Sequence, residues 1–315
     1  MTKPSSPLSA NPSYKNNGGN LQDKNREKES YPKELSIVIT TKCNMRCKVC
    51  LQQEFASSFN MTLIDKLSHV IPQLELLHPI GGEPLLCDLD PIYTLALKNN
   101  CKIKIITNGT LITDKVAENI VAHVDRLIVS IDGGTDAAYR EMRGSSIAKP
   151  LKGIGKVLTQ KAIAGKISSP TIEINYLLTR TTIDSLPELA QRAKILGIDY
   201  INLFYPAFSD QELKRKESIG PDMAKAKIKE AASFANIIEP ENRGGEICRR
   251  PWNTCFIDVN GNVFGCCYGS PALGNLNHSR FDDCWFGPVA QNLRKTVNTD
   301  QEIPSCRKCI VRKRA

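Results

Sequence analysis

Hydrophobic positions along the chain form short runs of aliphatic and β-branched residues that alternate with stretches of helical periodicity. Six of these runs predict β-strands, at residues 36–40, 74–78, 102–107, 126–131, 171–178 and 200–204. Helical patterns lie between them, near residues 62–71, 89–99, 113–122, 150–165 and 183–196. Strands that alternate with helices predict a parallel sheet built from right-handed βαβ units. An α/β domain is therefore expected over residues 34–210.

The segments on either side of this domain have a different composition. Residues 1–33 are rich in Ser, Asn, Pro, Lys and Glu, which predicts a disordered leader. Residues 211–246 carry many charges and predict an exposed flanking helix and a linker, and residues 247–315 hold most of the remaining cysteines. No apolar run approaches the roughly 18 residues of a membrane span, and no secretory signal is present. Closely spaced cysteines favour metal binding in a reducing cytoplasm.

A first group of cysteines follows the first predicted strand directly. Cys43, Cys47 and Cys50 form a C-x3-C-x2-C pattern, so three thiols can converge on one inorganic centre without long-range folding. A closed zinc or iron–sulfur site has four protein ligands, so a triplet leaves one position for another molecule. The alternative is a structural zinc site that takes its fourth cysteine from elsewhere in the chain.

A glycine-rich loop follows the second predicted strand. Its residues are Gly81, Gly82, Glu83 and Pro84. The carboxyl ends of parallel strands share one edge of the sheet, where ligands bind, so this loop is expected beside the cysteine triplet. The two glycines allow the backbone to approach a ligand closely, and the Glu83 carboxylate can accept hydrogen bonds from an ammonium group.

Together, the cysteine triplet and the Gly-Gly-Glu-Pro loop resemble the radical S-adenosylmethionine (radical SAM) superfamily. The resemblance covers residues 34–210 and implies a partial (β/α)6 barrel with a [4Fe–4S] cluster that SAM chelates at its open iron. It implies that Glu83 contacts the SAM amino group, and that an electron donor such as flavodoxin or ferredoxin reduces the cluster. Val49 departs from the family, which usually has an aromatic residue before the third cysteine. Further matching positions that the resemblance assigns to SAM binding are Asn108, Ser130, Asp132 and Arg143.

A second group of cysteines occupies the C-terminal part of the chain, at residues 248, 255, 266, 267, 284, 306 and 309. Asn260-Gly261 between alternating apolar residues predicts a β-hairpin that folds Cys266 back towards Cys248. Cys306 and Cys309 then complete a set of four ligands, which suits an iron–sulfur cluster or zinc. Cys267 is an alternative to Cys266, because adjacent residues of a strand point to opposite faces.

Residues 247–310 resemble the SPASM/twitch extension of radical SAM enzymes. The resemblance implies one auxiliary [4Fe–4S] cluster, held by Cys248, Cys266, Cys306 and Cys309, in a small β-hairpin and helix extension. Cys255 is expected near the junction with the barrel, where the substrate must lie.

Two reaction outcomes are compatible with this architecture, both beginning with removal of a substrate hydrogen atom by a 5′-deoxyadenosyl radical. In net oxidation, such as alcohol dehydrogenation or peptide crosslinking in natural-product biosynthesis, the auxiliary cluster accepts the remaining electron. In epimerisation, a thiol such as Cys255 returns a hydrogen atom. The substrate is expected to be a small molecule or a peptide. A net charge of +9 with only 6% aromatic residues indicates a solvated basic surface, so a metal-bound nucleic-acid scaffold is a remote alternative.

Overall fold

A computed structural model describes residues 30–208, 210–240 and 247–309 of the chain. Of the predicted leader, residues 1–29 lie outside the described residues. Tyr31 already contacts the folded region: its hydroxyl donates a hydrogen bond to Asp282 Oδ1 at 3.1 Å. Its ring also packs against Phe286, with 5.3 Å between the ring centroids. Tyr31, which lies within the predicted leader, therefore packs against the extension.

One mixed sheet forms the centre of the molecule. Its strands are β1 (Glu34–Thr40), β2 (Leu76–Gly81), β3 (Lys102–Thr107), β4 (Arg126–Ser130), β5 (Thr171–Leu177), β6 (Tyr200–Phe204), β7 (Ile237–Ile238), β8 (Thr254–Ile257), β9 (Asn262–Phe264) and β10 (Ala272–Asn275). Their order across the sheet is β10-β9-β8-β1-β2-β3-β4-β5-β6-β7. Strands β1 to β6 are parallel and neighbour one another in chain order. The predicted partial barrel is confirmed.

Helices connect these strands. The α-helices are α1 (Asp90–Lys98), α2 (Asp114–His123), α3 (Asp136–Arg143), α4 (Ala148–Ile163), α5 (Leu186–Leu196), α6 (Gln211–Glu217), α7 (Pro221–Ala232), α8 (Arg250–Asn253), α9 (Phe281–Trp285), α10 (Pro288–Thr296) and α11 (Pro304–Arg307). Short 3-10 helices are η3 (Met61–Leu67), η4 (Ile71–Gln73), η5 (Pro84–Leu86) and η6 (Ile183–Ser185). Capping residues mark the ends of several of these helices. Thr113 caps α2 by accepting a hydrogen bond from Val116 N–H, and Gly197 ends α5 in the left-handed conformation.

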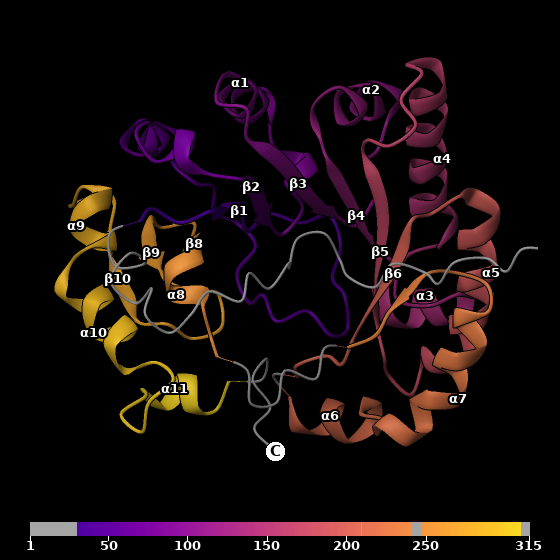
Figure 1. The fold of residues 1–315 in the computed structure, drawn as a ribbon. Helices are drawn as coiled ribbons and strands as arrows, with labels where there is room; N and C mark the ends of the chain where they lie inside the picture. The colour runs from indigo at the N-terminus through magenta and orange to yellow at the C-terminus, as the bar shows by residue number, and fades with distance from the viewer. Residues whose placement is uncertain (1–29, 209, 241–246, 310–315) are drawn as a thin grey trace, which may run out of the picture. The chain divides into compact units, whose positions relative to one another are not determined.

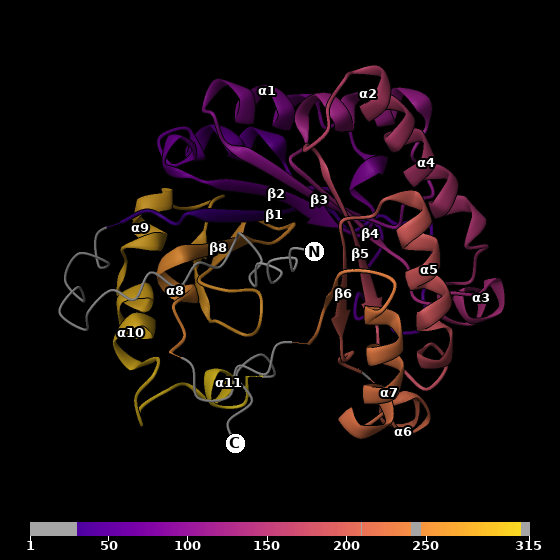
Figure 2. The same ribbon diagram turned by 45° about the vertical axis from the view of Figure 1, so that its right-hand side comes forward.

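The two faces of the sheet differ in what covers them. Leu35, Ile37 and Ile39 of β1 are almost completely buried on the outer face, whereas Ser36 and Val38 between them are partly exposed on the inner face. Figures 1 and 2 show α1, α2, α4 and α5 along the outer face of the sheet. The main hydrophobic core therefore lies between the sheet and these helices, and the inner face carries the more polar side chains.

The C-terminal extension continues the same sheet. Strand β8 pairs in parallel with β1, with Cys255 opposite Leu35. Strands β8 and β9 form the predicted antiparallel hairpin, and Gly261 in its turn has a φ of 81°, which glycine tolerates. Figures 1 and 2 show helices α8 to α11 beside this hairpin, away from α5 and α7.

The flanking segment differs from the single exposed helix expected over residues 211–246. It contains two helices, α6 and α7, and the short strand β7. Pro221 occupies the first turn of α7, where its missing N–H leaves no bond unmade, so the second helix starts there. Glu217 at the end of α6 is only 3% exposed, although the surrounding sequence is highly charged.

Candidate functional site

The cysteine loop, defined as residues 41–50, leaves the carboxyl end of β1. Cys43 and Cys47 are half-buried and Cys50 is exposed. The loop is held by backbone contacts on two sides. Glu83 N–H donates to the carbonyl of Lys42 at 2.9 Å, and Lys48 N–H donates to the carbonyl of Met142 at 2.9 Å. The loop after β2 and the end of α3 therefore fix the path of the three cysteines.

Gly81 and Gly82 make a close approach between two backbones. A Cβ atom at Gly81 would overlap the carbonyl oxygen of Thr40, and one at Gly82 would overlap those of Thr41 and Lys42. Gly81 also has a φ of 146°, which other residues rarely adopt. The glycines were expected to admit a ligand. In the structure their close backbone contact is with the start of the cysteine loop, and their contact with a ligand stays a prediction.

Glu83 is a fully buried carboxylate at this contact. It accepts hydrogen bonds from Thr107 Oγ1 at 2.6 Å, Asn108 N–H at 2.8 Å and Leu85 N–H at 3.1 Å. Burial raises the pKa of Glu83, and these three donors oppose that rise. An ionised carboxylate has about four acceptor positions, so one remains for an ammonium group. Pro84, also buried, starts the 3-10 turn that follows.

Asn108 joins the loop after β3 to the cysteine loop. Its Nδ2 donates to Asn44 Oδ1 at 2.8 Å, and its Oδ1 accepts from Thr110 Oγ1 at 2.6 Å. Asn44 Nδ2 in turn donates to Thr110 Oγ1 at 2.9 Å. Asn108 thus contacts the cysteine loop through its side chain and Glu83 through its backbone.

Asp132 and Arg143 form a buried ion pair next to the cysteines. Arg143 Nε donates to Asp132 Oδ2 at 2.6 Å, and Asp132 Oδ1 accepts from Leu177 N–H at 2.8 Å. Arg143 Nη1 reaches Cys47 Sγ at 3.7 Å. Burial raises the pKa of the Cys47 thiol, and the charge of Arg143 opposes that rise. Ser130, at the carboxyl end of β4, lies half-buried on the strand that leads to Asp132.

A polar cavity of about 320 Å³ adjoins this pair. Its lining residues come from the cysteine loop, from the loop after β3 and from the segment between α3 and α4: Asn44, Met45, Arg46, Thr110, Arg143, Gly144, Ser145 and Lys149. Three of these side chains are cationic. The cavity is therefore suited to a polar ligand that carries a carboxylate.

The surroundings of the cysteine triplet fit an iron–sulfur cluster. Met45 N–H donates to Cys43 Sγ at 3.4 Å, and hydrogen bonds to sulfur are one of the means by which proteins tune such clusters. Among the described residues, no three Cys, His, Asp or Glu side chains converge as ligands of a single metal ion.

Cys306 lies near enough to three other cysteines of the extension for their charges to affect it. Burial is the main cause that raises the pKa of Cys306 to about 11, and Cys266, Cys248 and Cys309 contribute to the same rise. Tyr268 N–H donates to Cys266 Sγ at 3.4 Å, as Met45 N–H does to Cys43. The adjacent Cys267 interacts instead with Arg250 and Lys104. The interaction with Cys306 favours Cys266 over Cys267 as the fourth ligand, and this assignment stays a prediction.

Cys255 lies at the expected junction of the barrel and the extension, on the strand that pairs with β1, but its side chain is in the core. It is 1% exposed and belongs to the hydrophobic core. Because directly paired residues of neighbouring strands share a face, Cys255 lies on the outer face with its partner Leu35. The inner face, which carries Ser36, is on the other side of the sheet. This placement disagrees with a position beside the substrate.

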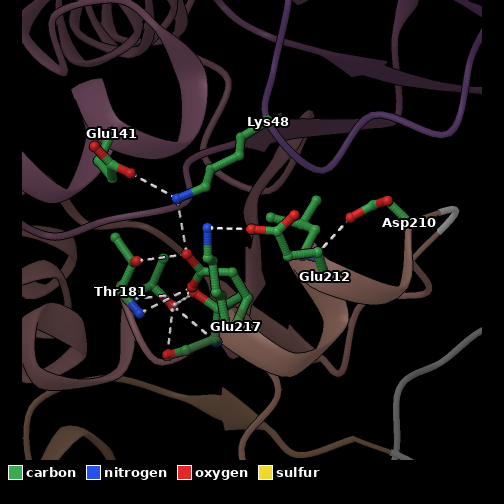
Figure 3. A network of polar contacts seen from close by, with 10 residues as sticks. Lys48, Glu141, Thr181, Asp210, Glu212 and Glu217 are labelled. Atoms are coloured by element: carbon green, nitrogen blue, oxygen red, sulfur yellow. Dashed lines mark hydrogen bonds and ion pairs between the residues drawn. The ribbon is translucent and has the colours of Figure 1, made fainter.

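Several residues that the sequence pattern did not single out also shape the site. Figure 3 shows Lys48, within the cysteine triplet, between Glu141 of α3 and Glu217 of α6, with its Nζ 2.8 Å from Glu217 Oε1. Asn298 accepts from Cys248 N–H at 2.7 Å and donates to the carbonyl of Cys248 at 3.0 Å. Cys87, half-buried, interacts with Thr40 at the carboxyl edge. Of these residues, only Lys48 could have been noticed in the sequence, because it lies inside the cysteine motif.

Comparisons with known families match two parts of the chain. The Radical SAM superfamily matches residues 37–161, and the SPASM iron–sulfur cluster-binding domain matches residues 248–310. None of the helices in the described ranges combines the length and apolar character that a membrane span needs.

Individual relatives are distant. An AdoMet-dependent heme synthase of Methanosarcina barkeri is 24% identical, across 90% of this chain and 89% of the relative. A GTP 3′,8-cyclase of Clostridium botulinum is 31% identical over 172 residues, and the chain spans about half of that relative's length. Among solved structures, SuiB of Streptococcus suis bound to S-adenosylmethionine has a TM-score of 0.69 at 16% identity, covering 90% of this chain and 71% of SuiB. Native anSMEcpe with bound AdoMet and the Cp18Cys peptide has a TM-score of 0.66 at 15% identity, covering 89% of this chain and 86% of that one.

Proposed function

Since the chain belongs to the radical SAM superfamily and carries a SPASM iron–sulfur domain, we propose that it catalyses a net oxidation of its substrate. Its cofactors are a [4Fe–4S] cluster, S-adenosylmethionine and an auxiliary cluster in the SPASM domain. When bound, they supply reductive cleavage of SAM to methionine and a 5′-deoxyadenosyl radical, together with an acceptor for the substrate's remaining electron. The chain's own residues bind these groups and position the substrate.

We assign Cys43, Cys47 and Cys50 to the first cluster. The conformation of their loop supports this, since Gly82 and Glu83 hold it against the end of β2. For SAM we assign the free acceptor position of Glu83 to the amino group and the cationic cavity beside Arg143 to the carboxylate. The Asp132 carboxylate keeps the Arg143 side chain in place.

The observation that carries the choice of oxidation is the group of four cysteines in the extension. A cluster with four protein ligands has no open position, so it exchanges electrons but does not chelate a substrate. Asn298 supports this group, because it ties Cys248 to the segment that precedes Cys306 and Cys309. Placement of Cys255 on the outer face argues against the epimerisation route that it was expected to serve.

For the substrate we propose a peptide. Solved structures that share the fold include SuiB bound to its precursor peptide SuiA and anSMEcpe bound to the Cp18Cys peptide. The shared fold covers 84% and 89% of this chain, and this likeness supports the proposal. The heme synthase relative points to the competing class, a small molecule.

Metal analysis and SAM cleavage test this assignment. Anaerobically reconstituted protein is expected to hold about eight iron and eight sulfide per chain, the content of two cubanes. The triple change of Cys43, Cys47 and Cys50 to Ala is expected to halve the iron and to abolish 5′-deoxyadenosine formation with dithionite. Iron near zero with stoichiometric zinc would contradict the proposal.

Adjacent cysteines provide a matched control for the second cluster. Cys266→Ala is expected to lose about half of the iron and to keep SAM cleavage, because the first cluster remains. Cys267→Ala is expected to keep the full iron content. The reverse pattern would assign the auxiliary cluster to Cys267.

A further inference from the structure

An apolar pocket of about 130 Å³ lies at the carboxyl edge of the sheet. Its wall is formed by six apolar or aromatic residues and one serine: Leu178, Tyr205, Pro206, Phe208, Ile219, Pro221 and Ser218. A cavity of about 150 Å³ holds one benzene molecule, so this pocket has room for one ring or one branched aliphatic group. None of the described residues in its wall is charged, so a charged group would gain no ionic partner there.

The pocket is built from segments that follow strands. Leu178 comes directly after β5, and residues 205–208 come directly after β6. Ser218 and Ile219 lie in the connection between α6 and α7. The cysteine loop leaves the same edge of the sheet after β1, and this is the edge at which α/β proteins bind ligands.

One chain of contacts joins the pocket wall to the cysteine loop through Glu217, which precedes Ser218. As Figure 3 shows, Glu217 accepts from Lys48 Nζ at 2.8 Å and from Thr181 Oγ1 at 2.9 Å. Thr181 N–H also donates to Glu217 Oε2 at 3.2 Å. Lys48 lies between Cys47 and Cys50, so this side of the pocket wall is attached to the cysteine loop.

A second chain of contacts begins at the residue before Leu178. Leu177 N–H donates to Asp132, Asp132 pairs with Arg143, and Arg143 reaches Cys47 Sγ. Leu178 itself donates its N–H to the carbonyl of Phe204 at 2.8 Å. The wall of the pocket is thus tied to the cysteine triplet at two independent points.

We propose that this pocket binds an apolar side chain of the peptide substrate and so fixes the peptide relative to the cysteine loop. The inference rests on the proposed function and deepens it, since it names the part of the substrate that the site selects. Lys48 and Glu217 are positioning residues, because their ion pair holds the pocket wall against the cysteine loop. One ring or branched aliphatic group fills the volume, which a tetrapyrrole would exceed.

Binding of capped amino acids tests the pocket directly. The probe is N-acetyl-4-fluorophenylalanine amide, followed by 19F NMR with the reconstituted enzyme, and N-acetyl-leucine amide and N-acetyl-lysine amide are the competitors. Leucine amide is expected to displace the probe and lysine amide to fail. Ser218→Phe fills the pocket and Phe208→Ala removes one wall, so each is expected to weaken probe binding by about tenfold. The control is Ser68→Phe at an exposed position, which is expected to leave probe binding unchanged.

Equal displacement by leucine and lysine amides would overturn the inference, as would unchanged probe affinity in both pocket variants. Absence of probe binding to the wild-type enzyme would overturn it too. Iron content and SAM cleavage of the same wild-type samples report on the proposed function separately. A sample with full iron and active SAM cleavage that does not discriminate between the amides would contradict the pocket alone.

Discussion

Glu83 has a carboxylate with three protein donors and one acceptor position left over. Glu83→Gln removes the negative charge and replaces one acceptor oxygen by an NH2 group, which cannot accept the bond from Asn108 N–H or Thr107. A hydrogen bond to a charged group contributes about 1.5–3 kcal/mol, so SAM affinity is expected to fall by roughly tenfold or more. Equilibrium dialysis with SAM measures this.

A substitution of a surface glutamate serves as the control, because it removes the same charge far from the proposed SAM site. Glu118→Gln on the exposed surface of α2 is expected to leave SAM affinity unchanged. Both variants are first compared for iron content, so that any loss of affinity is measured with the clusters intact. Unchanged affinity in Glu83→Gln would remove Glu83 from the SAM site.

At the residue scale, motif spacing was a good guide where the chemistry is local. Cys43, Cys47 and Cys50 lie on one loop, and the loop with Glu83 lies next to it, as parallel strand order requires. The placement of Cys255 could not be read in the same way. It depends on which strand β8 joins and in which register, and a shift by one residue would move the side chain to the other face.

At the element scale, helix α6 presents one glutamate to the interior and another to solvent. Glu217 pairs with Lys48 and its side chain is 4% exposed, whereas Glu212 pairs with Lys216 and its side chain is 62% exposed. Glu217→Gln is expected to lower the free energy of unfolding by about 1.5–3 kcal/mol. Glu212→Gln, on the same helix, is expected to cost less than about 0.5 kcal/mol because its ion pair is screened by water. Denaturant unfolding of both variants measures the difference.

The pKa of Glu217 determines how its contribution to the free energy of unfolding changes with pH. Burial acts to raise the pKa of Glu217, but the hydrogen bonds from Lys48 and Thr181 outweigh it, so the pKa is lowered. Because the pKa is lowered, Glu217 contributes fully to the free energy of unfolding at pH values above 4.5, the pKa in the unfolded chain. This contribution is lost only as the pH falls through the pKa of the folded protein. The difference between wild type and Glu217→Gln is therefore expected to stay constant between about pH 6 and pH 8. A difference that shrinks within that range would contradict the assignment.

Elements with a strong periodic pattern were predictable, and those set by tertiary contacts were less so. Strands β3 and β6 begin and end where the pattern predicts, at residues 102–107 and 200–204. Helix α3 was missed because it is short and strongly charged, and only Tyr139 and Met142 of it are buried. The pattern near 62–71 forms the 3-10 helix η3 and the start of the 3-10 turn η4, in whose first turn Pro72 lies.

At the scale of the whole molecule, the barrel and the extension form one sheet, and the direction of electron flow between them decides the product. Turnover of the peptide in D2O separates the two outcomes. Oxidation yields a product that has lost two hydrogen atoms and gained no deuterium, whereas epimerisation through a thiol places one deuterium on the product carbon. Mass spectrometry of the product distinguishes them.

Thiol variants identify a donor if one exists. Cys255→Ala is expected to be nearly silent because Cys255 lies on the outer face. Cys87→Ala tests the half-buried thiol at the carboxyl edge and is also expected to keep the oxidised product. Deuterium in the wild-type product, together with a stalled Cys87→Ala enzyme, would replace oxidation by epimerisation.

The pairing of β8 with β1 has a consequence for how the protein is made. Strand β1 begins at residue 34 and gains β2 as its first neighbour from residue 76, but its second neighbour begins only at residue 254. Ribosomes add about 5–20 residues per second, so β1 remains an open edge for many seconds while the rest of the barrel emerges. An open strand edge invites pairing with other chains. The open edge of the strand that leads into the three cysteines is thus covered by the C-terminal extension only when synthesis is nearly complete.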